Sequence, residues 1–309
     1  MMKKVVQLGA ALAATAALFA LTGCPSERGR TNKIVVVTTN FPLYDMARSI
    51  GGDKADVSLL LPPGVEPHAF EPTPGDIVRI NEADMFVYTG RFMEPWAAGV
   101  VKGATNSKLL VVDASSGVQL ATASSRNTGE HAGAPDPHIW LDFADAKIMA
   151  MNIKAAFEAR DREHADFYEK TAGEYATRLD RLDKQYRGAL SSCRSREIVY
   201  GGHYAFGYLA ARYGLKYIAA QGLSPDAEPS ARDLTSLVDQ IRKDGVTYVF
   251  YEELTSPKIA ETVARETKAK LLLLNAAHNI ARDQRDRGVT FFEIMTQNLE
   301  NLKTGLGCK

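Results

Sequence analysis

Histidine is the residue type in this chain whose placement points most directly to chemistry. The 309 residues contain six histidines, and four of them lie in loops beside predicted strands or at predicted helix starts. A neutral imidazole is a common ligand for transition metals. These four residues are His68, His138, His203 and His278.

Four imidazoles from separate loops are compatible with a tetrahedral metal site. Zn²⁺ binds imidazole nitrogen at about 2.0–2.1 Å, and four protein ligands close its coordination shell. Three of the four histidines follow predicted strands, and ligands of open α/β sheets bind at that end of the strands. The alternative is four unrelated loop histidines with local hydrogen bonds. Spacing alone does not decide between them, because no compact signature such as H-E-x-x-H is present.

The other two histidines have different surroundings. His164 lies in a charged helical stretch, where a solvated surface histidine is expected. His131 lies in a loop rich in small residues. We therefore exclude both from the predicted site.

Buried strands and helices alternate from residue 33 onward. The strands are continuously apolar, which is typical of a parallel sheet covered on both faces. Their alternation with helices indicates an α/β protein. The predicted strands are 34–39, 57–61, 85–90, 108–113, 197–201, 215–220, 246–252 and 270–275.

One predicted helix is unusually long and charged. It runs over about 163–190 and separates two groups of alternating strands and helices. A helix of that length can act as a stiff connector. We therefore expect two lobes, each with a mostly parallel sheet flanked by helices, joined by this backbone helix.

The N-terminus has the anatomy of a secretory signal. Lys3 and Lys4 precede an apolar run that ends in the small residues of 21-LTGC-24. This stretch also resembles the bacterial lipobox, in which the cysteine is lipidated and begins the mature chain. We expect a signal peptide over 1–23 and a lipidated tether over 24–32.

Charge and cysteine content bear on the partners of the protein and on the compartment in which it acts. Lys plus Arg equals Asp plus Glu at 37 each, which argues against a nucleic-acid partner. Export implies an oxidising compartment, where Cys193 and Cys308 could form a disulfide. Sequence spacing cannot give their distance, so their pairing stays open.

Several blocks of the chain resemble one family, the zinc/manganese solute-binding lipoproteins of bacterial ABC importers. Together they cover nearly the whole chain after the tether, in the family's order, and the P-H-x-F-E-P-T-P and D-P-H-x-W-L-D patterns are specific. The matching stretches are 38-TTNFPLYDMARSIGGD-53, 66-EPHAFEPTP-74, 86-FVYTGRFMEPW-96, 136-DPHIWLD-142, 201-GGHYAFGYLAARYGL-215, 228-EPSARDL-234 and 257-PKIAETVARETKAKLLLLN-275.

The resemblance implies a metal site in the cleft between two α/β lobes. The first three family ligands correspond to His68, His138 and His203. The fourth family ligand is usually a carboxylate near the last strand, where this chain has 275-NAAHN-279. Position and chemistry favour His278 there, with Asp283 or a water as alternatives. A histidine-only shell favours zinc over manganese or ferrous iron.

The resemblance also implies the function and its partners. We expect an exported, monomeric, non-enzymatic protein that captures Zn²⁺ and delivers it to an ABC permease with its ATPase. Its lipid on Cys24 would hold it at a bacterial membrane, facing the periplasm or the outside. After the tether, the expected parts are a lobe over 33–160, the connecting helix over 161–190 and a lobe over 191–309.

A zinc hydrolase is the competing prediction from another class. If only three histidines bound the metal, an open position could hold a water, with Glu71 or Glu253 as a base. Four imidazoles would close that position.

Overall fold

The computed structural model describes residues 33–123, 133–223, 229–254 and 256–309. The predicted signal peptide, the tether with Cys24, and His131 lie outside the described residues. Among the helices of the described ranges, none combines the length and the apolar character needed to cross a membrane.

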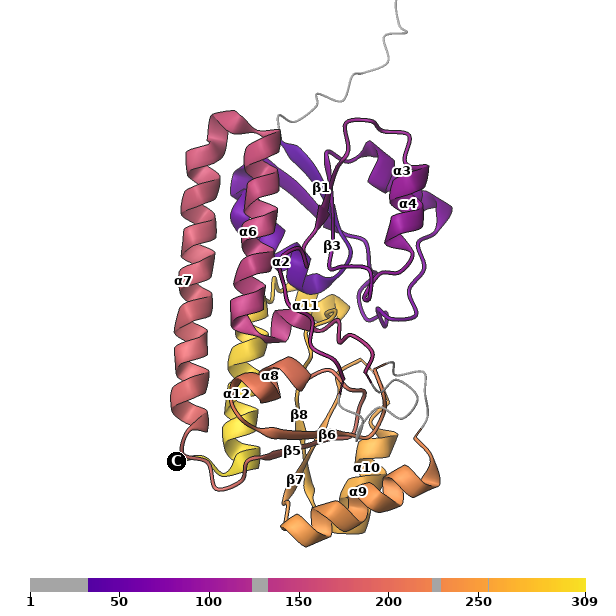
Figure 1. Cartoon of the computed structure of the whole chain (residues 1–309), viewed down its shortest axis with the longest axis vertical. Coiled ribbons are helices and arrows are strands. Elements are labelled where there is room, and N and C mark those ends of the chain that lie inside the picture. Colours follow the sequence, from indigo (N-terminus) through magenta and orange to yellow (C-terminus); the bar gives the residue numbers. More distant parts are fainter. Residues whose placement is uncertain (1–32, 124–132, 224–228, 255) are drawn as a thin grey trace, which may run out of the picture. The chain divides into compact units, whose positions relative to one another are not determined.

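Two parallel sheets of four strands each form the framework (Figure 1). The first sheet has the order β2-β1-β3-β4, and the second has the order β6-β5-β7-β8. Every pair of neighbouring strands is parallel. The two lobes therefore share one strand order, although the sequence contains no recognisable internal repeat.

All eight predicted strands are present, and their ends differ from the prediction by at most two residues. Continuous apolar runs identify them well because both sheets are covered on both faces. The strands are β1 (Ile34–Thr38), β2 (Ala55–Leu59), β3 (Met85–Tyr88), β4 (Leu110–Asp113), β5 (Glu197–Tyr200), β6 (Lys216–Ala219), β7 (Tyr248–Tyr251) and β8 (Lys270–Leu273).

Helices connect the strands and cover the sheets. Side-chain caps mark several of their starts, including Thr73, Ser230 and Thr290, each in a capping box with an acidic residue three positions later. The helices are α2 (Phe41–Gly51), α3 (Pro74–Glu82), α4 (Ala97–Gly103), α6 (Phe143–Arg160), α7 (Ala165–Leu190), α8 (Gly207–Arg212), α9 (Ala231–Asp244), α10 (Lys258–Thr267), α11 (Arg282–Asp286) and α12 (Phe291–Leu306), with 3-10 turns η1 (Gly52–Lys54), η3 (Ile139–Leu141) and η4 (Arg162–His164).

The sequence after β5 predicts a helix over 203–214, and the structure has this helix with a later start. Helix α8 begins only at Gly207. The His203 carbonyl, which would accept the first hydrogen bond of a helix starting at His203, instead accepts the Tyr217 hydroxyl at 3.2 Å. His203 donates to the Glu252 carboxylate at 3.1 Å, and Tyr204 donates to the Gly222 carbonyl at 2.7 Å. His203 is thus held by a bonded loop rather than by a helix.

The long helix α7 contacts elements of both lobes. It packs along α6 and also against α2 and α12 (Figure 1). Tyr175 donates its hydroxyl to Asp45 of α2, and Tyr186 donates to the Met295 carbonyl of α12. These two tyrosines tie one rigid element to the helices beside each sheet. The arrangement agrees with the predicted connecting role.

Cys193 and Cys308 form a disulfide, which settles the pairing that the sequence leaves open. The bond joins the loop after α7 to the loop after α12 across 115 residues of chain. Next to it, Ser195 donates its backbone N–H to the Leu306 carbonyl at 2.9 Å. The disulfide therefore closes nearly the whole second lobe into one covalent loop.

Breaking this disulfide should lower stability. A disulfide typically stabilises a protein by about 2–4 kcal/mol, mainly by restricting the unfolded chain. We expect Cys308→Ser to lower the free energy of unfolding by about that amount in urea titrations. Reductant should lower the stability of the native protein and leave the variant unchanged; a native protein indifferent to reductant would contradict the expectation.

Candidate metal centre

The structure brings the four predicted histidines to one point. His68 follows β2, His203 follows β5 and His278 follows β8, while His138 lies in the long connection between β4 and α6. One ring nitrogen from each of the four lies within 4.8 Å of the corresponding atom of the others. His138, His203 and His278 are buried, and His68 is partly buried. Two of these residues come from each lobe.

The spacing of the ring nitrogens suits a tetrahedral ion. His138 Nε2 lies 3.2 Å from His68 Nε2 and 3.2 Å from His203 Nε2. Bonds of about 2.0–2.1 Å to a tetrahedral zinc ion would place neighbouring nitrogens about 3.3 Å apart. His278 Nε2 is buried and has no hydrogen-bond partner. A buried polar atom of that kind calls for a missing partner, and a bound ion is one such partner.

Carboxylates lie behind two of the imidazoles. His138 Nδ1 lies 2.6 Å from Asp136 Oδ1, and the His138 backbone N–H donates to the same oxygen. His203 Nδ1 lies 2.6 Å from Glu252 Oε1, and Glu252 Oε2 accepts the His203 backbone N–H. Each carboxylate thus fixes both the ring and the backbone of one histidine. A proton held on Nδ1 leaves Nε2 free to bind a metal.

His278 also has a carboxylate neighbour, but at a longer distance than the other two pairs. His278 Nδ1 lies 3.8 Å from Glu253 Oε1, while Glu253 Oε2 accepts the Ala276 backbone N–H at 3.0 Å. Adjacent glutamates at the end of β7 therefore support different histidines. The residue before His278 is Ala277, whose φ of 59° is a left-handed conformation that costs energy for a residue with a Cβ.

Burial and neighbouring carboxylates set the protonation of the site. Burial lowers the pKa values of His68, His138 and His278 well below the ordinary value. Burial also acts to lower the pKa of His203, but Glu252 and the nearby glutamates raise it to a net value above the ordinary one. Three imidazoles are therefore neutral near pH 7, and His203 is the one that holds a proton most readily.

Two acids beside the histidines, Asp136 and Glu253, have raised pKa values. Burial raises the pKa of Asp136 to about 7, against the opposing effect of the His138 N–H. Burial and the charge of Glu252 raise the pKa of Glu253 to about 8. A cation at the centre would favour the ionised form of both groups, so metal binding should release protons.

A glycine makes room for one of these carboxylates. A Cβ built on Gly202 would overlap Glu252 Oε2 and would lie 2.8 Å from both the Glu252 Cβ and the Tyr200 ring. No side chain fits there while Glu252 stays in place. Gly202 is thus required for the approach of Glu252 to His203.

Other residues considered from the sequence do not join the cluster. Asp283 is exposed in α11 and pairs with Arg287 at 3.1 Å, so it is not a candidate for the fourth position. His164 lies 2.8 Å from Asp161 in η4, in agreement with a surface role. Glu71 is exposed and lies outside the group of four.

Asp136 and Glu252 are supporting residues that were not predicted from the sequence. Asp136 stands two residues before His138, and this close Asp-x-His spacing was a usable signal. Glu252 comes from the end of another strand, 49 residues away from His203. Only the parallel pairing of β5 with β7 places it there.

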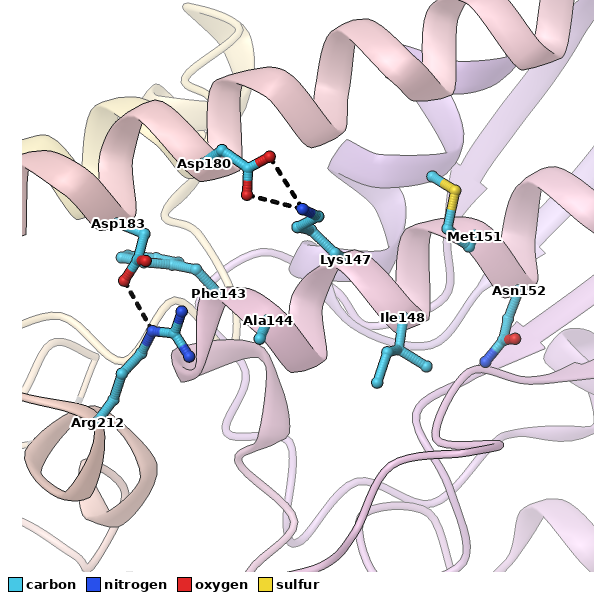
Figure 2. Close-up of a pocket in the computed structure, with 9 residues that line it drawn as sticks. All are labelled: Phe143, Ala144, Lys147, Ile148, Met151, Asn152, Asp180, Asp183 and Arg212. Atoms are coloured by element: carbon cyan, nitrogen blue, oxygen red, sulfur yellow. Dashed lines mark hydrogen bonds and ion pairs between the residues drawn. The ribbon is translucent and has the colours of Figure 1, made fainter.

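A separate pocket of about 590 Å³ lies along α6 and α7 and holds none of the four histidines (Figure 2). Its charged groups pair with one another: Lys147 lies 2.7 Å from Asp180, and Arg212 lies 2.8 Å from Asp183. These ion pairs join α7 to α6 and α8. We assign the pocket no ligand.

Two parallel-sheet lobes along one long helix, with imidazoles converging at the ends of strands, define the class of two-lobed metal-binding receptors. Within this class, the chain belongs to the ZnuA family: the family model described as zinc-uptake complex component A, periplasmic, matches residues 36–305. Members of this family are solute-binding components of zinc uptake, so the chain is not an enzyme. The hydrolase alternative is therefore set aside.

Named relatives agree with this assignment. The high-affinity zinc uptake system protein ZnuA of Bacillus subtilis is 39% identical over 96% of this chain and 96% of its own length. The zinc-binding lipoprotein AdcA of Streptococcus pneumoniae is 33% identical over 98% of this chain, which spans 61% of that longer protein. The crystal structure of the Zn(II)-bound ZnuA-like domain of AdcA aligns with a TM-score of 0.77 and 34% identity, covering 89% of this chain and 99% of that domain.

Gly202→Ala should weaken zinc binding. The added Cβ forces Glu252 away from His203, and loss of such a supporting group typically costs about 10–100-fold in metal affinity. Affinity can be measured by competition with a fluorescent zinc chelator. Gly99→Ala is the matched control, because a Cβ at Gly99 meets no atom within 4 Å. Equal affinities for the two variants would contradict the role of Glu252.

Proposed function

We propose that this chain captures Zn²⁺ through His68, His138, His203 and His278 and delivers it to an ABC permease with its ATPase. The observation that carries the proposal is the convergence of four buried or partly buried imidazole nitrogens at one point. The zinc-related names of the family and of the relatives support the choice of metal.

The donor set itself favours zinc. Every candidate ligand is an imidazole nitrogen, whereas Mn²⁺ prefers carboxylate oxygens. The carboxylates of Asp136 and Glu252 lie beside the Nδ1 atoms of His138 and His203, on the side of each ring opposite to Nε2. Ferrous iron and manganese are the alternative cargoes, and they should bind more weakly than zinc.

The cellular setting follows from the N-terminal sequence and from the relatives. We propose that residues 1–23 are removed as a signal peptide and that Cys24 carries a lipid, with 24–32 as a tether. The name of the AdcA relative as a lipoprotein supports this reading. The protein would then act as a monomer at a bacterial membrane, facing the periplasm or the outside.

Both lobes contribute ligands to the proposed site. We propose that 33–160 and 191–309 act as the two lobes and 161–190 as the connecting helix. Each lobe supplies two of the four histidines. Zinc binding would then join the lobes, and movement between them would allow release to the permease.

The direct test is metal content followed by single-ligand variants. Purified protein should carry one zinc ion per chain by elemental analysis, and zinc should outcompete manganese in titration. His203→Ala should lower zinc affinity by more than about 100-fold, since loss of a supporting residue alone already costs about 10–100-fold. His164→Ala should bind zinc like the native protein. Equal losses in the two variants would refute the assignment of the site.

Zinc affinity should fall as the solution becomes more acidic. The ligating form of His203 is neutral, and the pKa of this histidine is raised. As pH falls through that pKa, zinc must displace a proton, so affinity should drop by about tenfold per pH unit for each proton released. Competition titrations between about pH 8 and pH 5.5 measure this slope around the ordinary histidine pKa. An affinity independent of pH over that range would contradict an all-histidine shell.

A further inference from the structure

The segment that carries His278 leaves the second lobe but bonds to elements of the first. It follows β8 of the second sheet. The Phe41 N–H at the start of α2 donates to the His278 carbonyl at 3.1 Å, and the Gly64 N–H donates to the Ile280 carbonyl at 3.0 Å. The Trp140 indole donates to the Ala276 carbonyl at 2.7 Å. Three hydrogen bonds therefore join this segment to the first lobe.

Asn279 adds two further hydrogen bonds to the first lobe. Its side chain is completely buried. Its Nδ2 donates to the Pro62 carbonyl at 2.7 Å and to the Val65 carbonyl at 2.9 Å, while its Oδ1 accepts the Ile280 N–H. Both amide protons are used, and both bonds go to the loop that leads to His68. Buried hydrogen bonds of this kind fix the relative position of two loops.

These hydrogen bonds lie close in the chain to three of the four histidines. Asn279 follows His278 directly and ties its loop to the loop of His68, and Trp140 stands two residues after His138. His203, by contrast, is held by Glu252 of the second lobe. Ala277 has a strained backbone, with φ of 59°. It lies between Ala276, whose N–H donates to Glu253, and His278, whose carbonyl accepts a hydrogen bond from the first lobe.

We propose that Asn279 is a positioning residue for the metal site: it holds His68 and His278 at ligating distance by binding the loop of one to the loop of the other. The inference rests on the proposed zinc-binding function. His68, His138 and His278 then act as a preformed group attached to the first lobe. His203 is positioned separately, by Glu252 at the end of β7.

Asn279→Asp tests this role with almost no change in size. The variant loses both N–H donors and sets a carboxylate against two carbonyl oxygens. We expect a zinc affinity lower by about 10–100-fold, the range for loss of a group that orients a ligand. The loss should come mainly from faster dissociation, measured by stopped-flow transfer of zinc to a chelator.

Asn152→Asp is the matched control. Asn152 Nδ2 also donates to two loop carbonyls, those of Ala114 and Ser116, at 3.0 and 2.8 Å, and neither loop residue adjoins a proposed ligand. Its zinc dissociation rate should stay native. If both variants changed zinc binding in proportion to their loss of thermal stability, Asn279 would have only a structural role and the inference would fail.

A double-mutant cycle separates positioning from other effects. If Asn279 acts through His278, then Asn279→Asp should cost little further affinity in a His278→Ala background. Full additivity would overturn the inference. Failure of the native protein to bind zinc would instead overturn the proposed function, whereas native binding with an unaffected Asn279→Asp variant would overturn the inference alone.

Discussion

The approach of four imidazoles in a buried space is the constraint on which the rest of this structure depends. Neutral rings at 3.2 Å gain little from one another, and burial makes an unpartnered nitrogen costly. Their arrangement must therefore be imposed by other groups. Asp136 and Glu252 orient two of the rings, and the backbone bonds of the His278 segment place the others.

The fold meets this constraint by using two lobes with the same strand order. Both sheets are parallel, so the loops that follow their strands gather at one edge of each sheet. Helix α7 and its tyrosines hold the helices beside both sheets. The loops therefore converge from two separate sheets rather than from one continuous sheet.

The elements that the sequence predicted best are those governed by local patterns. Continuous apolar runs located the eight strands, because both sheets are covered on both faces. The predicted helix start at His203 was too early because the Tyr217 hydroxyl, from a different strand, donates to the His203 carbonyl, a contact that no local pattern encodes. The short elements α4 and α11 also lay below what periodicity could resolve.

The sequence alone determined the α/β class, the alternation around a long helix, and the histidines themselves, because residue type and local spacing encode these features. The family resemblance predicted that His68, His138 and His203 correspond to the first three metal ligands. Tertiary structure decided that His278 rather than Asp283 lies with them, that Cys193 pairs with Cys308, and that Asn279 bonds to the His68 loop. These contacts join residues up to 217 positions apart, a separation at which no local pattern carries information.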